Sequence, residues 1–194
     1  MFIYPLAAAL FLIASATVYA EEKNSRHFYL GIDAASGKAR EKSHPAGFRV
    51  TSETGRVTGG RLFAGYQFDE KIGLELGMVR SSNYKQSATN GFASYDAVVE
   101  TKNYDLVLVY KLTDYLPGFF LTGGMSYKTA RTTAAVRVPV LSISTNVSEE
   151  KSSSNFLIGA GYEANISGSL DGRINYARYG EENFLTFGVK YRFE

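Results

Sequence analysis

Six charged residues of this chain stand on segments of alternating polarity, on the face that is otherwise rich in glycine. They are three acids and three bases: Asp33, Glu75 and Asp105, with Arg61, Arg173 and Lys190. Unpaired charges in a narrow, dry interior are strongly unfavourable, so we expect these residues to pair across strands. Arg61 and Asp33 are expected at similar depth on neighbouring strands. The network is either a permanent polar core or a gate that opens to ions, and we favour the permanent core because so narrow an interior rarely leaves a channel.

The two histidines do not form a recognisable catalytic or metal-binding motif. His27 precedes the first alternating segment, and His44 lies in the polar sequence Ser43-His44-Pro45. Nucleophilic catalysis needs a nucleophile, a base and an orienting acid together, and no motif of that kind surrounds His44. The chain has no Cys, so two isolated histidines do not make a spaced set of metal ligands. We therefore predict no catalytic residues, no metal site and no cofactor.

Residues 1–20 form an apolar stretch that ends in Val18-Tyr19-Ala20, directly before the charged Glu21 and Glu22. This pattern predicts a cleaved signal peptide, which leaves residues 21–194 as the mature domain. The alternative is an N-terminal membrane anchor, which is less favoured because the apolar core is shorter than the roughly 20 residues of a helical span. Export without Cys also predicts a fold built without disulfides.

Composition excludes two classes of protein. With 21 Lys plus Arg against 19 Asp plus Glu, the formal charge is +2, which argues against a nucleic-acid partner. Beyond residue 20 the apolar runs are too short for membrane-spanning helices. Aromatic residues make up 14% of the chain and it has 19 glycines, which favours an all-β protein with aromatic anchors.

Period-two alternation predicts eight strands, and eight is the smallest even number that closes a membrane barrel. In each, large apolar residues occupy one face and glycine or polar residues the other. The predicted strands are 28–35, 61–68, 72–79, 103–110, 119–128, 156–163, 170–176 and 185–193. The glycines of the polar face are expected to make room for long charged side chains.

The connections between these strands differ at the two ends. Long polar connections are expected at 38–57, 81–95 and 129–151, and short turns at 69–71, 113–118 and 165–169, while 178–183 is short at the long-loop end. This asymmetry is typical of outer-membrane barrels, so we prefer an apolar face toward lipid to a soluble barrel with an apolar interior. The Ser-rich stretch 142–154 is expected to be a loop, either a solvated spacer or a contact surface, and its composition favours the spacer.

Three sequences carry a resemblance to a known family: FYLGIDAASG from Phe28, GGRLFAGYQFDEKIGLELGMV from Gly59, and LTFGVKYRF ending at Phe193. The mature chain resembles the small eight-stranded outer-membrane barrels of the OmpA and OmpX type. The resemblance implies an antiparallel up-and-down transmembrane β-barrel in the outer membrane of a Gram-negative bacterium. The sequence is expected to depart from the family in having no periplasmic peptidoglycan-binding domain after the barrel. The resemblance also implies that Tyr191 and Phe193 form a signal for the barrel assembly machinery, although Glu194 follows the final aromatic residue.

Four basic residues stand where the apolar face is expected to stop at its extracellular end: Arg80, Lys102, Arg131 and Arg178. They are expected either to contact lipopolysaccharide phosphates or to be ordinary solvated charges.

The predicted function is that of a non-enzymatic barrel for surface interaction and outer-membrane integrity. The predicted partners are outer-membrane lipid, lipopolysaccharide, the assembly machinery and an unidentified extracellular ligand. The alternatives are a small gated porin and, more distantly, a lipid A-modifying enzyme.

Overall fold

The computed structural model describes residues 26–38, 47–138, 143–180 and 182–193. The predicted signal peptide and His44 lie outside these residues. In the described part of the chain the structure is all-β, with strands β1 (His27–Lys38), β2 (Arg49–Glu53), β3 (Arg56–Gln67), β4 (Ile72–Ser81), β5 (Tyr84–Thr89), β6 (Ser94–Lys111), β7 (Phe119–Val138), β8 (Ile143–Ser167), β9 (Leu170–Tyr179) and β10 (Glu182–Phe193). No helix in these residues is long and apolar enough to cross a membrane.

Eight of the described strands close into an antiparallel barrel. Each pairs with the next along the ring β1, β3, β4, β6, β7, β8, β9 and β10, and β10 pairs back with β1. The predicted eight-stranded barrel is therefore confirmed. β2 and β5 lie outside the ring, because β5 pairs with the upper part of β6 and β2 pairs with β5.

The outer surface of the barrel is an apolar band. Leu30, Leu62 and Leu106 are each more than half exposed, while Asp33, Arg61 and others of the alternate residues are buried inside. Aromatic rings cluster toward the short-turn end of the band, as in the contacts Phe28–Tyr66, Phe119–Tyr162 and Tyr191–Phe193. An apolar exterior with aromatic rings at its border is suited to lipid, as the alternation predicted.

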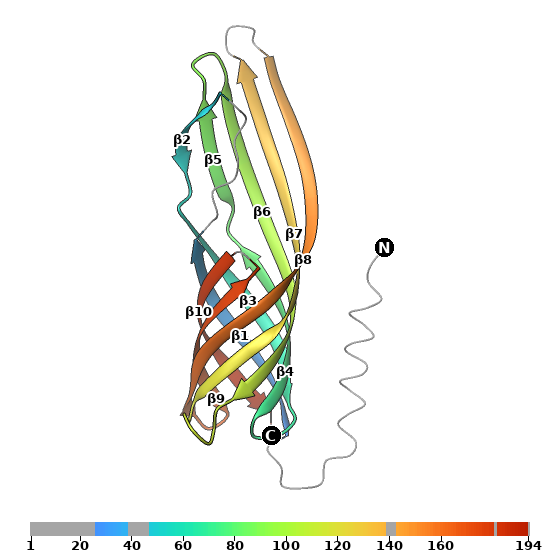
Figure 1. Ribbon diagram of the computed structural model, residues 1–194, viewed down its shortest axis with the longest axis vertical. Coiled ribbons are helices and arrows are strands. Elements are labelled where there is room, and N and C mark those ends of the chain that lie inside the picture. The colour runs from blue at the N-terminus through green and yellow to red at the C-terminus, as the bar shows by residue number, and fades with distance from the viewer. Residues whose placement is uncertain (1–25, 39–46, 139–142, 181, 194) are drawn as a thin grey trace.

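Two of the predicted long loops, 81–95 and 129–151, were wrong, because most of their residues form strands. Of the third, 38–57, residues 39–46 lie outside the described residues. β7 continues to Val138 and β8 begins at Ile143, so 129–151 is largely a two-stranded ribbon, and most of the Ser-rich stretch 142–154 belongs to β8. The register is unbroken from Phe119↔Tyr162 to Val138↔Ile143. The ribbon forms because each strand continues a ladder that is already aligned in the barrel below. Figure 1 shows β5, β6, β7 and β8 rising well beyond the short β9–β10 connection.

The parts of β5, β6, β7 and β8 that extend beyond the β9–β10 connection are called the raised sheet below. A small apolar cluster supports the raised sheet on its inner side. Val57, Tyr84 and Val99 are buried against one another, with Ala130 packed beside them. Tyr84 also donates a hydrogen bond from Oη to Glu53 Oε1 at 2.8 Å, which ties β5 to the end of β2. The predicted loop 81–95 is thus replaced by β5 and the start of β6, held by side-chain packing.

The opposite end of the barrel has the predicted short turns. In the β3–β4 turn, Asp69 Oδ1 accepts hydrogen bonds from the backbone N–H groups of Ile72 and Lys71, each at 2.7 Å, and these bonds lower the pKa of Asp69. Lys71 Nζ pairs with Asp114 Oδ2 of the next turn at 2.5 Å. Gly118 has a φ of 87°, a conformation that suits glycine, before β7 begins. Short turns mark the periplasmic end, so the raised sheet is extracellular.

Candidate functional site

Arg61 is the centre of an ion-pair network in the barrel interior. Its Nη2 and Nε donate to Asp105 Oδ1 and Oδ2 at 2.8 and 3.1 Å, and its Nη1 donates to Glu75 Oε2 at 2.9 Å. Arg173 Nη1 donates to the other oxygen of Glu75 at 2.7 Å. All four side chains are almost completely buried, so each guanidinium has carboxylate partners in place of water.

Asp33 is the loosest member of this network. It lies directly opposite Arg61 in the β1–β3 register, but its carboxylate oxygens are 3.6 Å from Arg61 Nη1 and 3.8 Å from Arg173 Nε. Neither oxygen accepts a hydrogen bond within the described residues. Asp33 and Arg61 are thus neighbours at one depth, as expected, but the close partners of Arg61 are Asp105 and Glu75.

Lys190 belongs to a second cluster nearer the periplasmic end. Its Nζ lies 2.5 Å from Glu163 Oε1 and 3.5 Å from Asp171 Oδ2, while Lys111 pairs with Glu163 at 3.1 Å and Arg192 with Asp171 at 3.1 Å. Sequence reasoning left these four partners out of the network. The signal for Glu163, Asp171 and Arg192 was present, since they alternate onto the same face as Arg173 and Lys190. Lys111 extends that face of β6 one step past the predicted strand end.

Taken together, the two clusters balance in charge over the part of the chain that the structure describes. The central cluster holds three acids and two arginines, whereas the lower cluster holds two acids and three bases. The excess of one cluster offsets that of the other. A barrel interior of low polarity favours such overall neutrality, because net buried charge is strongly unfavourable.

Glycines and one aromatic ring make room for the arginines. Phe63 lies against both guanidinium groups, with Cζ of Arg61 4.7 Å and Cζ of Arg173 4.6 Å from its ring centroid. A Cβ at Gly31 would overlap the Phe63 ring, and a Cβ at Gly77 would overlap Asp105 and the Arg61 guanidinium. These glycines therefore make space for large interior side chains, as predicted from the sequence.

The four basic residues predicted at the rim do not form one group. Arg80 and Lys102 are exposed register partners on β4 and β6. Arg131 lies in register between Glu100 of β6 and Glu150 of β8, and Arg178 donates from Nε to the carbonyl oxygen of Gly180 at 2.7 Å. Arg80 and Lys102 thus form an adjacent basic pair, while Arg131 is flanked by acids.

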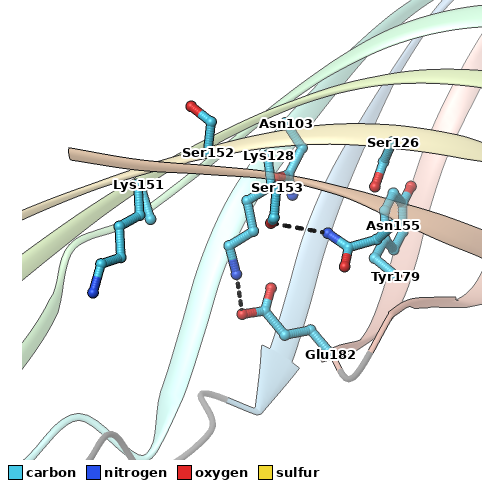
Figure 2. A pocket seen from close by; sticks show the side chains of 10 residues that line it. Asn103, Ser126, Lys128, Lys151, Ser152, Ser153, Asn155, Tyr179 and Glu182 are labelled. Carbon is cyan, nitrogen blue, oxygen red and sulfur yellow. Dashed lines mark hydrogen bonds and ion pairs between the residues drawn. The ribbon is translucent and has the colours of Figure 1, made fainter.

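A pocket of about 470 Å³ opens at the extracellular mouth of the barrel. β6, β7 and β8 supply most of its wall, and Tyr179 and Glu182 lie across from them at the β9–β10 connection. In Figure 2 the Lys128 ammonium group faces the Glu182 carboxylate, and Asn155 and Ser153 lie beside that ion pair. Sequence reasoning missed this pocket, because one wall is made by strand residues that were expected to be loop.

His27 is the one histidine among the residues that the structure describes. His27 lies on β1 at the periplasmic end, with its ring centroid 6.1 Å from that of Tyr29. Within residues 26–38, 47–138, 143–180 and 182–193, no group of three or more His, Cys, Asp or Glu side chains is placed to hold a metal ion. The chemistry that the interior does support is the mutual neutralisation of buried charges.

A closed antiparallel barrel with an apolar exterior and a charged interior defines a transmembrane β-barrel. Its family is identified by sequence: the model described as the outer membrane protein beta-barrel domain matches residues 6–193, and the chain belongs to that family. It is therefore a protein of the Gram-negative outer membrane. No curated protein matches the sequence at a significant level.

Solved structures share this fold at low sequence identity. The outer membrane protein OprG from Pseudomonas aeruginosa is 13% identical, with a TM-score of 0.57 and coverage of 88% of this chain and 97% of OprG. The attachment invasion locus protein Ail of Yersinia pestis, solved in complex with the heparin analogue sucrose octasulfate, is 13% identical, with a TM-score of 0.50 and coverage of 89% of this chain and all of Ail. At such identity the likeness establishes the fold alone.

The different contacts of Asp105 and Asp33 predict different effects of neutralising them. Asp105→Asn places an amide donor against the Arg61 guanidinium and should lower the free energy of unfolding by about 3 kcal/mol. Asp33→Asn removes a carboxylate without hydrogen bonds and should change it by less than about 1 kcal/mol. Urea titration in lipid vesicles, followed by the mobility difference between unboiled and boiled samples, measures both. Equal losses for the two variants would contradict this ranking of partners.

The space at Gly77 predicts a strong response to one added methyl group. Gly77→Ala should lower the free energy of unfolding by about 1 to 3 kcal/mol, because the Arg61–Asp105 pair must move. Gly123→Ala is the matched control, since a Cβ there meets nothing within 4 Å. The same urea titration should show the control near the parent. A Gly77→Ala barrel as stable as the control would show that the pair does not need this space.

Proposed function

We propose that this protein is a non-enzymatic outer-membrane barrel with a closed interior, whose interactions take place on the sheet that it raises above the membrane. The observation that carries the proposal is the filled interior. Arg61 pairs with both Asp105 and Glu75, Arg173 pairs with Glu75, and the rings of Phe63 and Phe120 pack against the Arg173 guanidinium group. This arrangement supports a permanent polar core over an open channel.

The raised sheet supports a role at the cell surface. Beyond Tyr127 the outer face of β7 changes from apolar residues to Thr129, Arg131 and Thr133. On β8 above Phe156, the alternate residues from Ser144 to Ser154 on the outer face are polar and exposed. At roughly 3.3 Å per residue, the β7–β8 ribbon extends about 30 Å past the apolar band. A sheet of that length displays far more surface to the outside than tight loops would.

The adjacent pair Arg80 and Lys102 supports contact with lipopolysaccharide. Both side chains are exposed one step above the apolar residues Met78 and Tyr104, where anionic phosphates of the outer leaflet lie. Arg131 and Arg178 contribute less in this proposal, because of the flanking acids and the Gly180 carbonyl bond respectively.

Export and assembly complete the proposal. Residues 1–20 serve as the signal peptide, and residues 21–194 form the mature barrel. Tyr191 and Phe193 lie on the outer face of β10, exposed and in ring contact at 5.1 Å between centroids. An exposed aromatic pair at the end of the last strand is accessible to the barrel assembly machinery. This exposure supports the role of Tyr191 and Phe193 as the assembly signal.

The closed interior predicts that the protein does not conduct ions in planar lipid bilayers. The purified parent protein should give no regular conductance steps, because the ion pairs leave no continuous water path. A porin barrel reconstituted in the same way serves as the positive control. Reproducible steps from the correctly folded parent, lost on boiling, would contradict the closed barrel and favour the gated porin.

The basic pair predicts salt-dependent binding of lipopolysaccharide. The double variant Arg80→Gln and Lys102→Gln should bind lipopolysaccharide several-fold more weakly than the parent at low salt, with the difference shrinking as salt rises. Arg137→Gln, an exposed change near the far end of β7, is the matched control. Association of the refolded proteins with lipopolysaccharide-containing vesicles measures the effect. If the double variant binds lipopolysaccharide as tightly as the parent at low salt, Arg80 and Lys102 do not contribute to this binding.

A further inference from the structure

The pocket at the extracellular mouth presents polar groups of both kinds along an open strand edge. Pairing between β8 and β9 ends with Leu157↔Tyr179, and Gly180 N–H donates to the carbonyl of Phe156 at 2.9 Å. In an antiparallel strand, alternate residues direct both backbone groups to the same side. Ser154 and Ser152 therefore direct their N–H and C=O groups to the side that β9 no longer covers.

The side chains of the pocket add further donors and acceptors. Asn103 is 3% exposed, and its Oδ1 has no hydrogen-bond donor within the described residues. A buried amide oxygen without a donor is unfavourable, and a hydroxyl or amide N–H from a ligand would satisfy it. Ser126, Ser153 and Asn155 surround the same space, and Asn155 Nδ2 donates weakly to Ser153 Oγ at 3.3 Å.

The charges of the pocket cancel locally. Lys128 pairs with Glu182 across the mouth, and Lys151 Nζ lies 3.0 Å from Glu149 Oε1. An anion would have to break one of these pairs to gain a lysine, and a cation would have to break one to gain a carboxylate. A neutral ligand with many hydroxyl groups can instead bond to both members of the Lys128–Glu182 pair without separating them.

We propose that this pocket binds a neutral saccharide. Its volume of about 470 Å³ falls within the roughly 300 to 1,000 Å³ of small-ligand pockets. The backbone edge of β8 and the Asn103 carbonyl supply bonds to sugar hydroxyls, and the Tyr179 ring lines the side toward the barrel, as Figure 2 shows. The inference deepens the proposed surface function and rests on it for the extracellular position of the pocket.

Calorimetric titration of the full barrel in lipid nanodiscs, prepared without sugar-based detergent, tests the proposal. The probes are maltotriose, lactose and chitotriose, with inorganic sulfate as the anionic comparison. At least one saccharide should bind the parent, and Asn103→Ala should weaken that binding about tenfold, the loss of roughly one good hydrogen bond. Asn146→Ala, an exposed asparagine of β8 outside the pocket, is the matched control and should bind like the parent.

Each other outcome overturns the inference. It fails if no saccharide of the panel binds, if sulfate alone binds, or if Asn103→Ala and Asn146→Ala bind equally well. Ser153→Ala, a change in a more exposed pocket residue, replaces Asn103→Ala if that variant does not show the faster gel migration of a folded, unboiled barrel. Failure here leaves the closed interior untouched, because that claim is measured by conductance and not by saccharide binding.

Discussion

A charge enclosed in a narrow barrel must meet an opposite charge, and the interior of this protein is arranged around that constraint. Arg61 donates two hydrogen bonds to Asp105 and one to Glu75, and Glu75 also accepts a hydrogen bond from Arg173. Gly77 leaves the space in which the Arg61–Asp105 pair fits. Because the inward side chains fill the interior and neutralise one another, the outward side chains of the same strands face lipid and are apolar. Closure of the strands into a ring leaves no backbone group unpaired in that lipid.

Alternation predicted the barrel because its two faces differ sharply in chemistry. In β4 the outward leucines and the inward glycines and Glu75 leave no doubt about which residues share a face. Above the membrane that contrast is lost, since both faces of the ribbon meet water and carry Ser, Thr and Ala. The upper parts of β7 and β8 therefore could not be distinguished from loop by periodicity. They are strands because the aligned ladders of the barrel continue into them.

The sequence predicted which interior residues share a face of their strand, but not which partner each side chain contacts. The six interior charges are all buried where alternation put them, but their partners depend on rotamers. Asp33 is opposite Arg61 in register, yet Asp105, from a strand that is not adjacent to β3, makes the closer bonds. The mouth pocket depended on the ends of two pairings, Leu157↔Tyr179 and Glu182↔Tyr179, which local sequence does not specify.

The most direct test of the account is the coupling free energy between Arg61 and Asp105. A double-mutant cycle with Arg61→Met, Asp105→Leu and both together, measured by urea unfolding in lipid vesicles, isolates the pair from its surroundings. The account predicts that each single variant strands a buried charge and that the double variant recovers about 2 kcal/mol or more of the summed loss. Strictly additive losses would contradict the claim that this buried pair organises the barrel interior.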